Sequence, residues 1–422
     1  MRITILTAGS LGDVQPYVAL GVGLRGAGHD VLLATHEKFR DLVQRHGLSF
    51  FSAAGNPQAM LENETGQRWL ESGKNPLAFM KRMIEVAHPL LWQLTSDYWQ
   101  ACQDADLILC HTLAVLSAAC ISEKLNIPDC PAYLHHVHRT RFYPSPVTVP
   151  LPTLGFMYNK LTYPLAEWIF WRMLQPVVNR WREEMLNLPP LPKKALFKDW
   201  VIQNKTCLYG FSPKVIPRAP EWGDEVHITG YWFLEKPADW KPPAGLVDFL
   251  ESGSPPVFIG FGSMVDRNPE EVTEKVLKAL ALSRQRGVLN TGWGSLGNGD
   301  LPDDVFKIDS VPFDWLFPKM SMVVHHGGAG TTATGLRAGV PSVIVPFFAD
   351  QHFWAWRVRE LGVGPKAISR KKLSAERLAT AINEVLGDKK MKTRAAALGR
   401  AIRSEDGVGQ AVRDIHDHFP MR

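Results

Sequence analysis

Short apolar runs alternate with amphipathic stretches along this chain, and the alternation stops once and then starts again. Residues 3–7 and 30–35 have the composition of buried strands, and residues 14–26 between them carry apolar side chains at helical spacing. The same order returns from residue 256 onward. Because strand–helix–strand units join parallel strands, the pattern predicts an α/β fold with two parallel sheets wound with helices.

The domain boundaries follow from the break in this alternation. Residues 235–243 are rich in proline and predict a stiff linker. We therefore expect a first domain over residues 1–234 and a second over residues 244–404. Residues 405–422 carry apolar side chains at helical spacing and predict a final helix.

Composition excludes several classes of protein. With 45% hydrophobic and 21% charged residues, the 422-residue chain resembles a soluble protein of two domains. The net charge of +5 comes without basic runs interleaved with aromatics, so no nucleic-acid partner is expected; an anionic small ligand or an acidic membrane surface suits it better. Five cysteines without a C-x-x-C pair indicate buried thiols in the cytoplasm. The longest apolar stretch, residues 107–121, is interrupted by His111 and is too short to cross a membrane.

A glycine-rich turn follows the apolar run at residues 321–324 and opens a helix that ends near Gly339. Glycines let the backbone approach an anion closely, and N–H groups at a helix start carry partial positive charge. The turn therefore predicts a phosphate site, to which Thr332 adds a hydroxyl; an ordinary tight turn is the alternative. The predicted ligands are His326, Gly328, Ala329, Gly330 and Thr331.

The next strand-like run, residues 342–348, leads directly to Asp350 and Gln351. In a parallel sheet, consecutive strands end at the same edge, which is where open α/β sheets bind ligands. We expect this carboxylate and amide beside the phosphate turn.

Residues 325–351 resemble the donor-binding signature of the UDP-glycosyltransferase superfamily, and residues 9–17 are similar to the N-terminal motif of its sterol 3β-glucosyltransferase and glycopeptide or polyketide glycosyltransferase branch. This resemblance implies the GT-B fold, in which two Rossmann-like domains face each other across a cleft and the final helix crosses back onto the first domain. It also implies a UDP-sugar as co-substrate, no other cofactor, no metal, and an apolar hydroxylated acceptor.

The resemblance further assigns roles to donor-side residues. Ser10 and Ser263 are expected to contact the donor, the backbone of Val311 to pair with uracil, and Asp350 and Gln351 to bind the sugar, for which glucose is favoured. Plant members stack a tryptophan on uracil where this chain has Ser310. The stacking partner stays open between Trp293 and Phe313.

Asp13 is the predicted general base, because an inverting transfer must remove the proton of the attacking hydroxyl. The alternative is that Asp13 only caps a helix beginning at Val14. His111 ends a strand at the same edge and is a candidate to assist or orient the base; a purely structural role is the alternative.

On the acceptor side, His135 and His138 are candidates to line the cleft. A metal site is the weaker alternative: His136 and His138 would share a strand face, but no carboxylate or cysteine lies nearby. Asp104 and Asp106 precede a strand rather than follow one, so they predict a solvated helix end instead of a metal–nucleotide site.

The aromatic segment around Trp168 has two interpretations. It is favoured as an amphipathic helix that covers the core, and left open as a helix that lines the acceptor site or contacts a membrane peripherally. For the whole chain, the expected activity is inverting transfer of glucose from UDP-glucose to a sterol or similar lipophilic alcohol. A UDP-sugar epimerase and a non-catalytic nucleotide-sugar-binding protein are the alternatives. The acceptor and the oligomeric state are not determined by the sequence.

Overall fold

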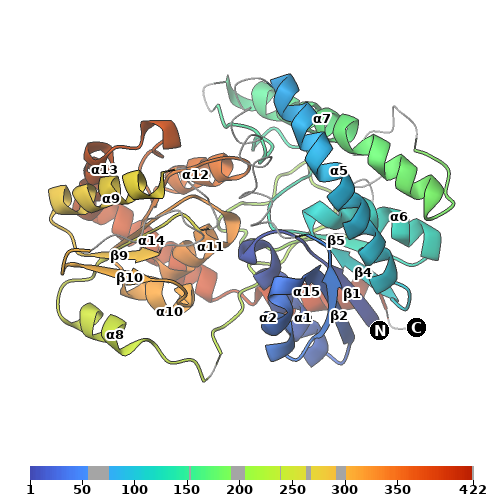
Figure 1. The fold of residues 1–422 in the computed structure, drawn as a ribbon, viewed down its shortest axis with the longest axis horizontal. Helices are drawn as coiled ribbons and strands as arrows, with labels where there is room; N and C mark the ends of the chain where they lie inside the picture. Colours follow the sequence, from blue (N-terminus) through green and yellow to red (C-terminus); the bar gives the residue numbers. More distant parts are fainter. Residues whose placement is uncertain are drawn as a thin grey trace.

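The computed structural model describes residues 1–55, 76–151, 154–191, 205–237, 239–262, 268–290 and 301–420, with the backbone alone for residues 76–88. These residues form two lobes that lie side by side, each built on its own sheet (Figure 1). Every strand pair within these ranges is parallel. The predicted fold class, two wound α/β domains, is confirmed.

The first sheet has the strand order β3-β2-β1-β4-β5-β6-β7. Its strands are β1 (Arg2–Leu6), β2 (Asp30–His36), β3 (Ser49–Ala53), β4 (Leu107–Cys110), β5 (Asp129–Tyr133), β6 (Cys207–Tyr209) and β7 (Val226–Ile228). In the centre, Ile3 of β1 is in register with Val31 on one side and Leu107 on the other. Strand β1 is almost wholly buried because helices cover both faces of the sheet.

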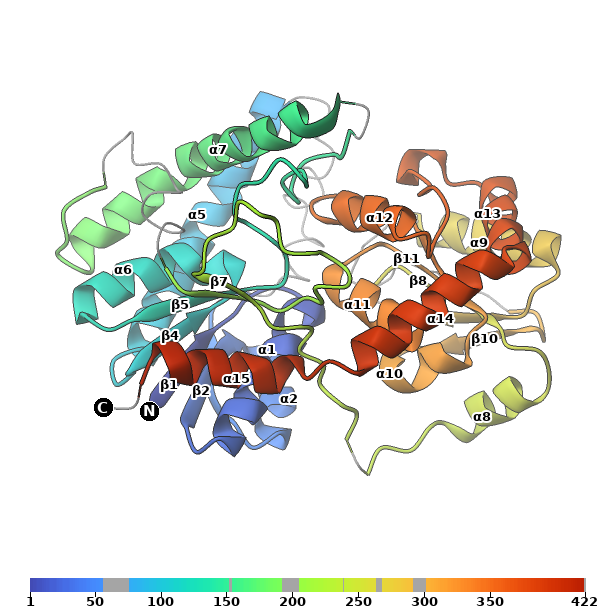
Figure 2. The same ribbon diagram turned by 180° about the vertical axis from the view of Figure 1, so that it is seen from behind.

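Helices α1 (Leu11–Gly26), α2 (Arg40–Arg45) and α15 (Gly407–His418) pack on one face of this sheet, and α5 (Pro76–Ala101) and α6 (Val115–Leu125) pack on the other. The long helix α7 (Gly155–Glu184) lies outside α5 and α6 (Figure 2). The first face buries Val18 and Leu20 against Ile415 of α15. The last helix of the chain therefore completes the core of the first lobe.

The second sheet has the order β10-β9-β8-β11-β12. Its strands are β8 (Val257–Gly260), β9 (Gly287–Asn290), β10 (Val305–Ile308), β11 (Met322–His325) and β12 (Ser342–Ile344). Its helices are α8 (Ala244–Glu251), α9 (Pro269–Ser283), α10 (Phe313–Leu316), α11 (Ala329–Ala338), α12 (Gln351–Glu360), α13 (Ala375–Gly387) and α14 (Lys389–Arg403). Helices α9 and α13 pack together over one face, and α8 and α10 cover the other.

Two element boundaries differ from the sequence-based expectation. The helix expected from Val14 begins at Leu11, because Ser10 is its N-cap. The strand expected to reach residue 348 ends at Ile344, because the chain then passes through Pro346 and a turn in which Ala349 has a φ of +51°. Helix α11 ends where expected, with Gly339 in the left-handed conformation.

The chain passes between the lobes at two places that touch each other. One is the segment after β7, and the other is the junction between α14 and α15. There Gly407 packs so closely on Tyr231 that an added Cβ would lie 2.3 Å from the carbonyl oxygen of Tyr231. Glu405 accepts a hydrogen bond of 2.7 Å from the hydroxyl of Ser212. A single cluster of buried apolar side chains also continues from the first lobe to Phe353 and Trp354 of α12.

Two further expectations can be compared with the structure. All five cysteines are buried and free, as expected from their spacing. Among the helices that the structure describes, none is long and apolar enough to span a bilayer.

Candidate active site

The strand order places one reversal point in each sheet, between β1 and β4 and between β8 and β11. Loops that leave on opposite faces at such a point open a binding site at the carboxyl ends of the strands. The two points face each other: an added Cβ on Gly330, at the start of α11, would lie 3.4 Å from the Cα of Gly12, at the start of α1. We call the residues gathered here the interdomain site; its central members are Asp13, His111, His326 and Asp350.

Asp13 is the third residue of α1, and its carboxylate serves the helix end and the interdomain site together. Oδ2 accepts hydrogen bonds from the backbone N–H of Ser10 at 2.8 Å and from the Ser10 hydroxyl at 2.9 Å. Oδ1 lies 3.8 Å from Nε2 of His111, and about a third of the side chain stays accessible. Asp13 is therefore not the N-cap; it forms the reciprocal half of a capping box with Ser10, and one oxygen remains toward His111.

His111 follows β4 and is buried. Its Nδ1 accepts a bond of 3.4 Å from the backbone N–H of Leu113, so the proton of the neutral ring lies on Nε2, toward Asp13. Burial lowers the pKa of His111, and the charge of Asp13 offsets part of that effect. A neutral imidazole that presents an N–H to a carboxylate can orient the carboxylate without neutralising it.

The turn after β1 depends on His36, which was given no role from the sequence. Gly9 has a φ of +122°, and a Cβ there would lie 2.4 Å from Oδ2 of Asp13. Its N–H donates to Nε2 of His36 at 3.0 Å, while Nδ1 of His36 faces the carbonyl of Ala54 at 3.0 Å. His36 therefore fixes the turn that presents Asp13. The second strand was expected to end at residue 35, whereas β2 ends at His36. His36 therefore lay outside the expected strand and had no expected role.

The phosphate turn is built mainly from backbone. Helix α11 begins after Gly328 without a side-chain cap, so the N–H groups of its first turn are available to an anion. The ring of His326 fits between two glycines: a Cβ on Gly328 would lie 2.5 Å from its Nε2, and one on Gly262 would lie 2.7 Å from its Cε1. His326 is buried, and its Nδ1 has no hydrogen-bond partner among the residues that the structure describes.

Two histidines precede this turn, and they differ in their hydrogen bonds. Nδ1 of His325 accepts the N–H of Gly327 at 3.1 Å, so His325 holds the turn. Burial lowers the pKa of His326 to about 4, so its ring is neutral at physiological pH and can donate one N–H. A buried polar nitrogen without a partner, beside uncapped helix N–H groups, fits a site for an anionic ligand.

The two threonines of this turn also differ. The hydroxyl of Thr332 is buried and donates to the carbonyl of Gly328 at 2.9 Å, so the expectation that it faces a phosphate is wrong. A helical Ser or Thr commonly bonds the carbonyl four residues earlier in this way. Thr331 is half-buried at the start of α11 and is the threonine that remains for a ligand.

Asp350 and Gln351 lie at the start of α12, after the strained turn at Ala349. Oδ2 of Asp350 accepts the indole N–H of Trp354 at 2.9 Å. Oε1 of Gln351 accepts the backbone N–H groups of Phe347 at 2.8 Å and Phe348 at 3.2 Å, so the amide oxygen is committed to the turn. Trp354 and the backbone of the turn were not expected to hold these two side chains.

Asp350 is electrostatically coupled to the opposite lobe. Burial raises the pKa of Asp350 to about 7, the hydrogen bond from Trp354 opposes this rise, and the negative charge of Asp13 adds to it. The negative charge of Asp13 in the first lobe therefore disfavours ionisation of Asp350 in the second. A bound ligand with hydroxyl groups between them would separate and solvate these charges.

The expected uracil contacts are only partly described. Val311 is buried in the core of the second lobe, so its backbone is what a base could use, and Ser310 is exposed. Phe313 stacks on Phe317 with 4.5 Å between ring centroids and meets Phe258 at 5.2 Å, so it packs against the core of the second lobe. Ser263 and Trp293 lie outside the described residues.

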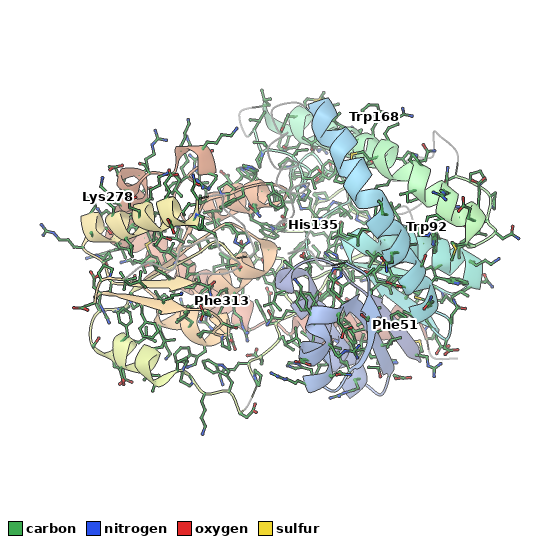
Figure 3. All side chains as sticks on the ribbon, in the orientation of Figure 1. Phe51, Trp92, His135, Trp168, Lys278 and Phe313 are labelled. Carbon is green, nitrogen blue, oxygen red and sulfur yellow. The ribbon has the colours of Figure 1, made fainter. Side chains whose placement is uncertain are left out.

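Of the acceptor-side histidines, His135 lies between the two lobes (Figure 3). Burial and the neighbouring His111 lower the pKa of His135 to about 4. His138 bonds the hydroxyl of Tyr209 through Nδ1 at 2.5 Å. The expectation that His136 and His138 share a strand face is wrong, because β5 ends at Tyr133.

Trp168 lies on the outer edge of the first lobe, on α7, while Trp171 of the same helix is buried (Figure 3). Asp104 and Asp106 follow α5 and bind Arg2, by an ion pair of 3.2 Å and a backbone hydrogen bond of 2.7 Å. Within the described ranges, no group of three His, Cys, Asp or Glu side chains could hold a metal ion.

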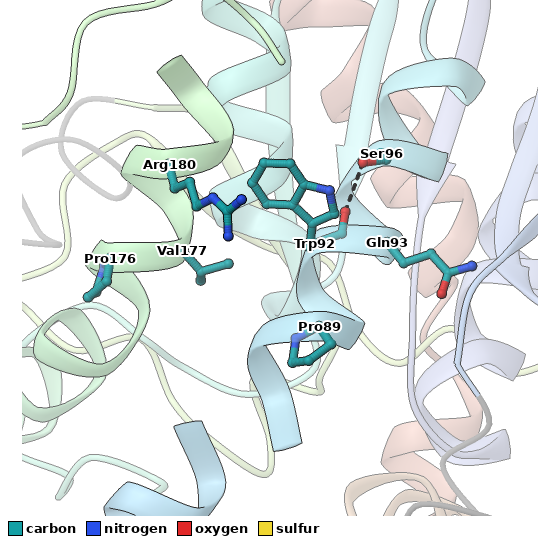
Figure 4. A pocket seen from close by; sticks show the side chains of 7 residues that line it. All are labelled: Pro89, Trp92, Gln93, Ser96, Pro176, Val177 and Arg180. Carbon is teal, nitrogen blue, oxygen red and sulfur yellow. Dashed lines mark hydrogen bonds between the residues drawn. The ribbon is translucent and has the colours of Figure 1, made fainter. Parts of the chain in front are cut away.

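Two hollows lie away from the central site residues. A surface groove between α5 and α7 is lined by Trp92, Val177 and Arg180 (Figure 4). A smaller apolar pocket among α5, α6 and α7 is lined by Leu116, Leu174 and Trp181, and it reaches Leu113, two residues after His111. The second hollow therefore lies in the apolar interior of the first lobe, next to the chain segment that follows His111.

Known protein families match both lobes. Residues 3–130 match the Glycosyltransferase family 28 N-terminal domain, and residues 294–413 match the C-terminal domain described as Erythromycin biosynthesis protein CIII-like. The chain is 38% identical over 441 residues to a sterol 3-beta-glucosyltransferase of Cryptococcus neoformans and 39% identical over 429 residues to one of Emericella nidulans. Both alignments cover 99% of this chain, which spans 27% and 30% of the length of these relatives.

Solved structures share the fold at lower identity. The glycosyltransferase of kitacinnamycin superposes with a TM-score of 0.71 at 21% identity, covering 99% of both chains. The calicheamicin glycosyltransferase CalG4 superposes with a TM-score of 0.70 at 17% identity, covering 99% of this chain and 98% of its own.

Proposed function

Since the chain belongs to the UDP-glycosyltransferase superfamily with the GT-B fold, we propose that it transfers a sugar from a UDP-sugar to a hydroxyl of a lipophilic acceptor, with inversion at the anomeric carbon. The observation that carries the proposal is the closeness of an accessible carboxylate, Asp13, to an uncapped, glycine-rich helix start from the other lobe. One side can accept a proton while the other stabilises a leaving diphosphate.

In the proposed mechanism, Asp13 accepts the proton of the acceptor hydroxyl as its oxygen attacks the anomeric carbon. The new C–O bond forms while the bond to the β-phosphate oxygen of UDP breaks on the opposite side of the sugar, which converts an α-linked donor into a β-glycoside. His111 orients the Asp13 carboxylate through its Nε2–H.

The departing UDP carries the negative charge that develops. The N–H groups at the start of α11 and one N–H of neutral His326 stabilise this charge, with Thr331 adding a hydroxyl. We propose that these groups act without a metal ion and that the enzyme has no cofactor besides its co-substrate. Asp350 and Gln351 contact the sugar hydroxyls, and glucose is the proposed sugar, in line with the relatives' names.

A sterol or similar alcohol is the proposed acceptor class, because the relatives are sterol 3-beta-glucosyltransferases and an apolar pocket is lined by Leu113, two residues after His111. Free, buried cysteines favour the cytoplasm as the location. An acceptor of this kind resides in lipid, so peripheral membrane contact belongs to the proposal.

The test is incubation with UDP-glucose and a panel of sterols and other lipophilic alcohols, with mass detection of the glucoside and NMR assignment of its anomeric configuration. A β-glucoside that disappears in Asp13→Asn supports the proposal. An epimerised UDP-sugar formed without acceptor would indicate an epimerase, and UDP binding without turnover on any alcohol would indicate a non-catalytic protein.

A further inference from the structure

The first half of α7 presents an apolar stripe to solvent. Met157 is 71% exposed, Leu161 62%, and Leu165 and Trp168 57% each. Their spacing of four, four and three residues places them on one face of the helix. A surface helix normally exposes charged side chains, so this stripe lacks an apolar partner within the described chain.

The opposite face of the same helix segment is well packed and contains polar groups. Tyr163, Ala166 and Trp171 are buried, and buried Glu167 forms an ion pair with Arg139. The outward apolar stripe is therefore not a consequence of poor packing. The helix is held in place by one face and presents the other.

The loop before α7 extends the apolar surface. Val147, Val149 and Leu151 are exposed, and Phe142 contacts Phe156 with 5.7 Å between ring centroids. Isolated exposed apolar residues are common, but a loop and a helix that together expose this many apolar side chains mark an interaction site. We call this loop and the α7 stripe the apolar ridge.

The charge around the apolar ridge indicates what it contacts. Residues 139–173 contain four basic side chains and one acidic side chain. Two of the basic side chains, Arg139 and Arg141, form ion pairs with Glu167 and Glu221. Lys160 and Arg172 are exposed on the same side of α7 as the stripe, and neither forms an ion pair with a described residue. Apolar side chains with a tryptophan and unpaired cations beside them match an anionic lipid surface.

The position of the ridge relative to the interdomain site supports this partner. Next to Phe142, Tyr143 contacts Arg357 of α12 at 5.8 Å, and His136 contacts Phe353 of α12 at 4.8 Å. Helix α12 begins at Gln351, so the loop before α7 adjoins the lobe boundary. The ribbon views show that the first turns of α7 are the end of the helix nearest α12 (Figures 1 and 2).

We propose that the apolar ridge docks the protein on the surface of a bilayer that contains anionic lipids, with α7 lying in the interface. The biological role of this docking rests on the proposed function, since a lipophilic acceptor would enter from that bilayer. Vesicle binding can be measured without any turnover, however, so the two proposals fail separately.

The experiment compares flotation of the full chain with vesicles of phosphatidylcholine alone and of phosphatidylcholine mixed with phosphatidylglycerol. The wild type should float with the mixed vesicles, and binding should fall with added salt. The variant Met157→Gln/Leu161→Gln/Leu165→Gln should lose at least about tenfold in vesicle partitioning, because each change removes several CH₂ groups from the lipid contact. Leu282→Gln changes an exposed leucine of α9 and is the matched control.

A Lys160→Glu/Arg172→Glu variant should lose the preference for mixed vesicles and keep its circular dichroism spectrum. Equal flotation of the wild type and the triple glutamine variant would overturn the proposal. So would a change of oligomeric state in the triple variant, measured by light scattering, since the ridge would then be an interface between copies of the chain. If a sugar is transferred, the triple variant should lose activity on vesicle-embedded acceptor but not on acceptor dissolved in detergent.

Discussion

The two sides of the interdomain site are built differently. On the second lobe, the anion-binding groups are mostly backbone N–H groups at the start of α11, which the glycine turn itself exposes. On the first lobe, the functional groups are side chains, and Asp13 is placed by contacts with Ser10 and by the nearby His111. Backbone sites tolerate substitution of most neighbouring side chains, whereas the first lobe's side fails when one side chain changes. Substitutions on the two sides should therefore differ in size and kind.

Asp13→Asn should produce the largest effect, a loss of turnover of ~10²-fold or more, because the general base is lost. Asparagine can still accept the Ser10 N–H, so the melting temperature and UDP affinity should stay close to those of the wild type. Initial rates, calorimetry with UDP and thermal unfolding measure the three quantities. Near-normal turnover would reduce Asp13 to its capping role.

His326→Ala tests a side chain of the second lobe, where backbone N–H groups form most of the anion site. It removes an N–H donor to the diphosphate, which should weaken UDP binding by roughly 1–3 kcal/mol. Titration calorimetry with UDP measures this change, and His326→Gln, which keeps a donor, should recover part of it. Unchanged UDP affinity together with unchanged turnover would show that the backbone alone holds the anion.

The paired threonines sharpen the comparison further. Thr331→Val should weaken UDP binding by about 1 kcal/mol through the loss of one hydroxyl. Thr332→Val should leave UDP affinity unchanged and lower the stability by about 1 kcal/mol, because its hydroxyl bonds Gly328 within the helix. UDP titration and thermal unfolding of both variants separate the two roles. The opposite outcome would mean that the two hydroxyls exchange roles when ligand binds.

Asp350 belongs to the second lobe, and its pKa depends in part on the charge of Asp13 in the first lobe. Since its folded pKa is raised to about 7, the unfolded chain loses this proton at lower pH, and the contribution of Asp350 to stability falls as pH rises from about 4 to about 7. The melting temperature of Asp350→Asn relative to wild type should therefore increase over that range, without ligand. In an Asp13→Asn background the rise should still begin near pH 4, which the unfolded chain sets, but it should end at lower pH and be smaller, because the folded pKa of Asp350 falls. An unchanged profile would show that the carboxylates do not interact.

Removal of metal ions should have the smallest effect. If the N–H groups of α11 and His326 stabilise the diphosphate, exhaustive EDTA treatment should leave turnover unchanged. The measurement is the initial rate before and after chelation. A loss that Mg²⁺ or Mn²⁺ alone restores would contradict the mechanism proposed for the second lobe.

The difference between the two sides also explains what the sequence could predict. Glycine turns, strand ends and helix stops are local features, so the wound sheets and the phosphate turn could be placed from the pattern of residues alone. The partners of His36, Trp354 and Thr332 depend on which strands neighbour each other and on where each helix begins. The predicted strand ended one residue before the observed end of β2, and this difference was enough for His36 to be overlooked.

The exposed face of α7 could not be predicted from the sequence either, for a different reason. Periodicity predicts an amphipathic helix but does not indicate which apolar stripe faces the core. Trp168 and Trp171 differ by three positions, yet only Trp171 is buried. That distinction depends on α5 and α6, whose packing against α7 is a tertiary property.

The two chain crossings between the lobes also define how the molecule can move. Because the segment after β7 and the junction before α15 touch at Gly230, Tyr231 and Gly407, they leave one pivot rather than two separated tethers. A shared crossing favours rotation of the lobes about it over sliding of one sheet edge past the other, and the apolar cluster that joins the first lobe to α12 must adjust as they rotate. We expect the start of α11 to move away from the start of α1 along an arc. The same rotation would then admit the donor and release the product.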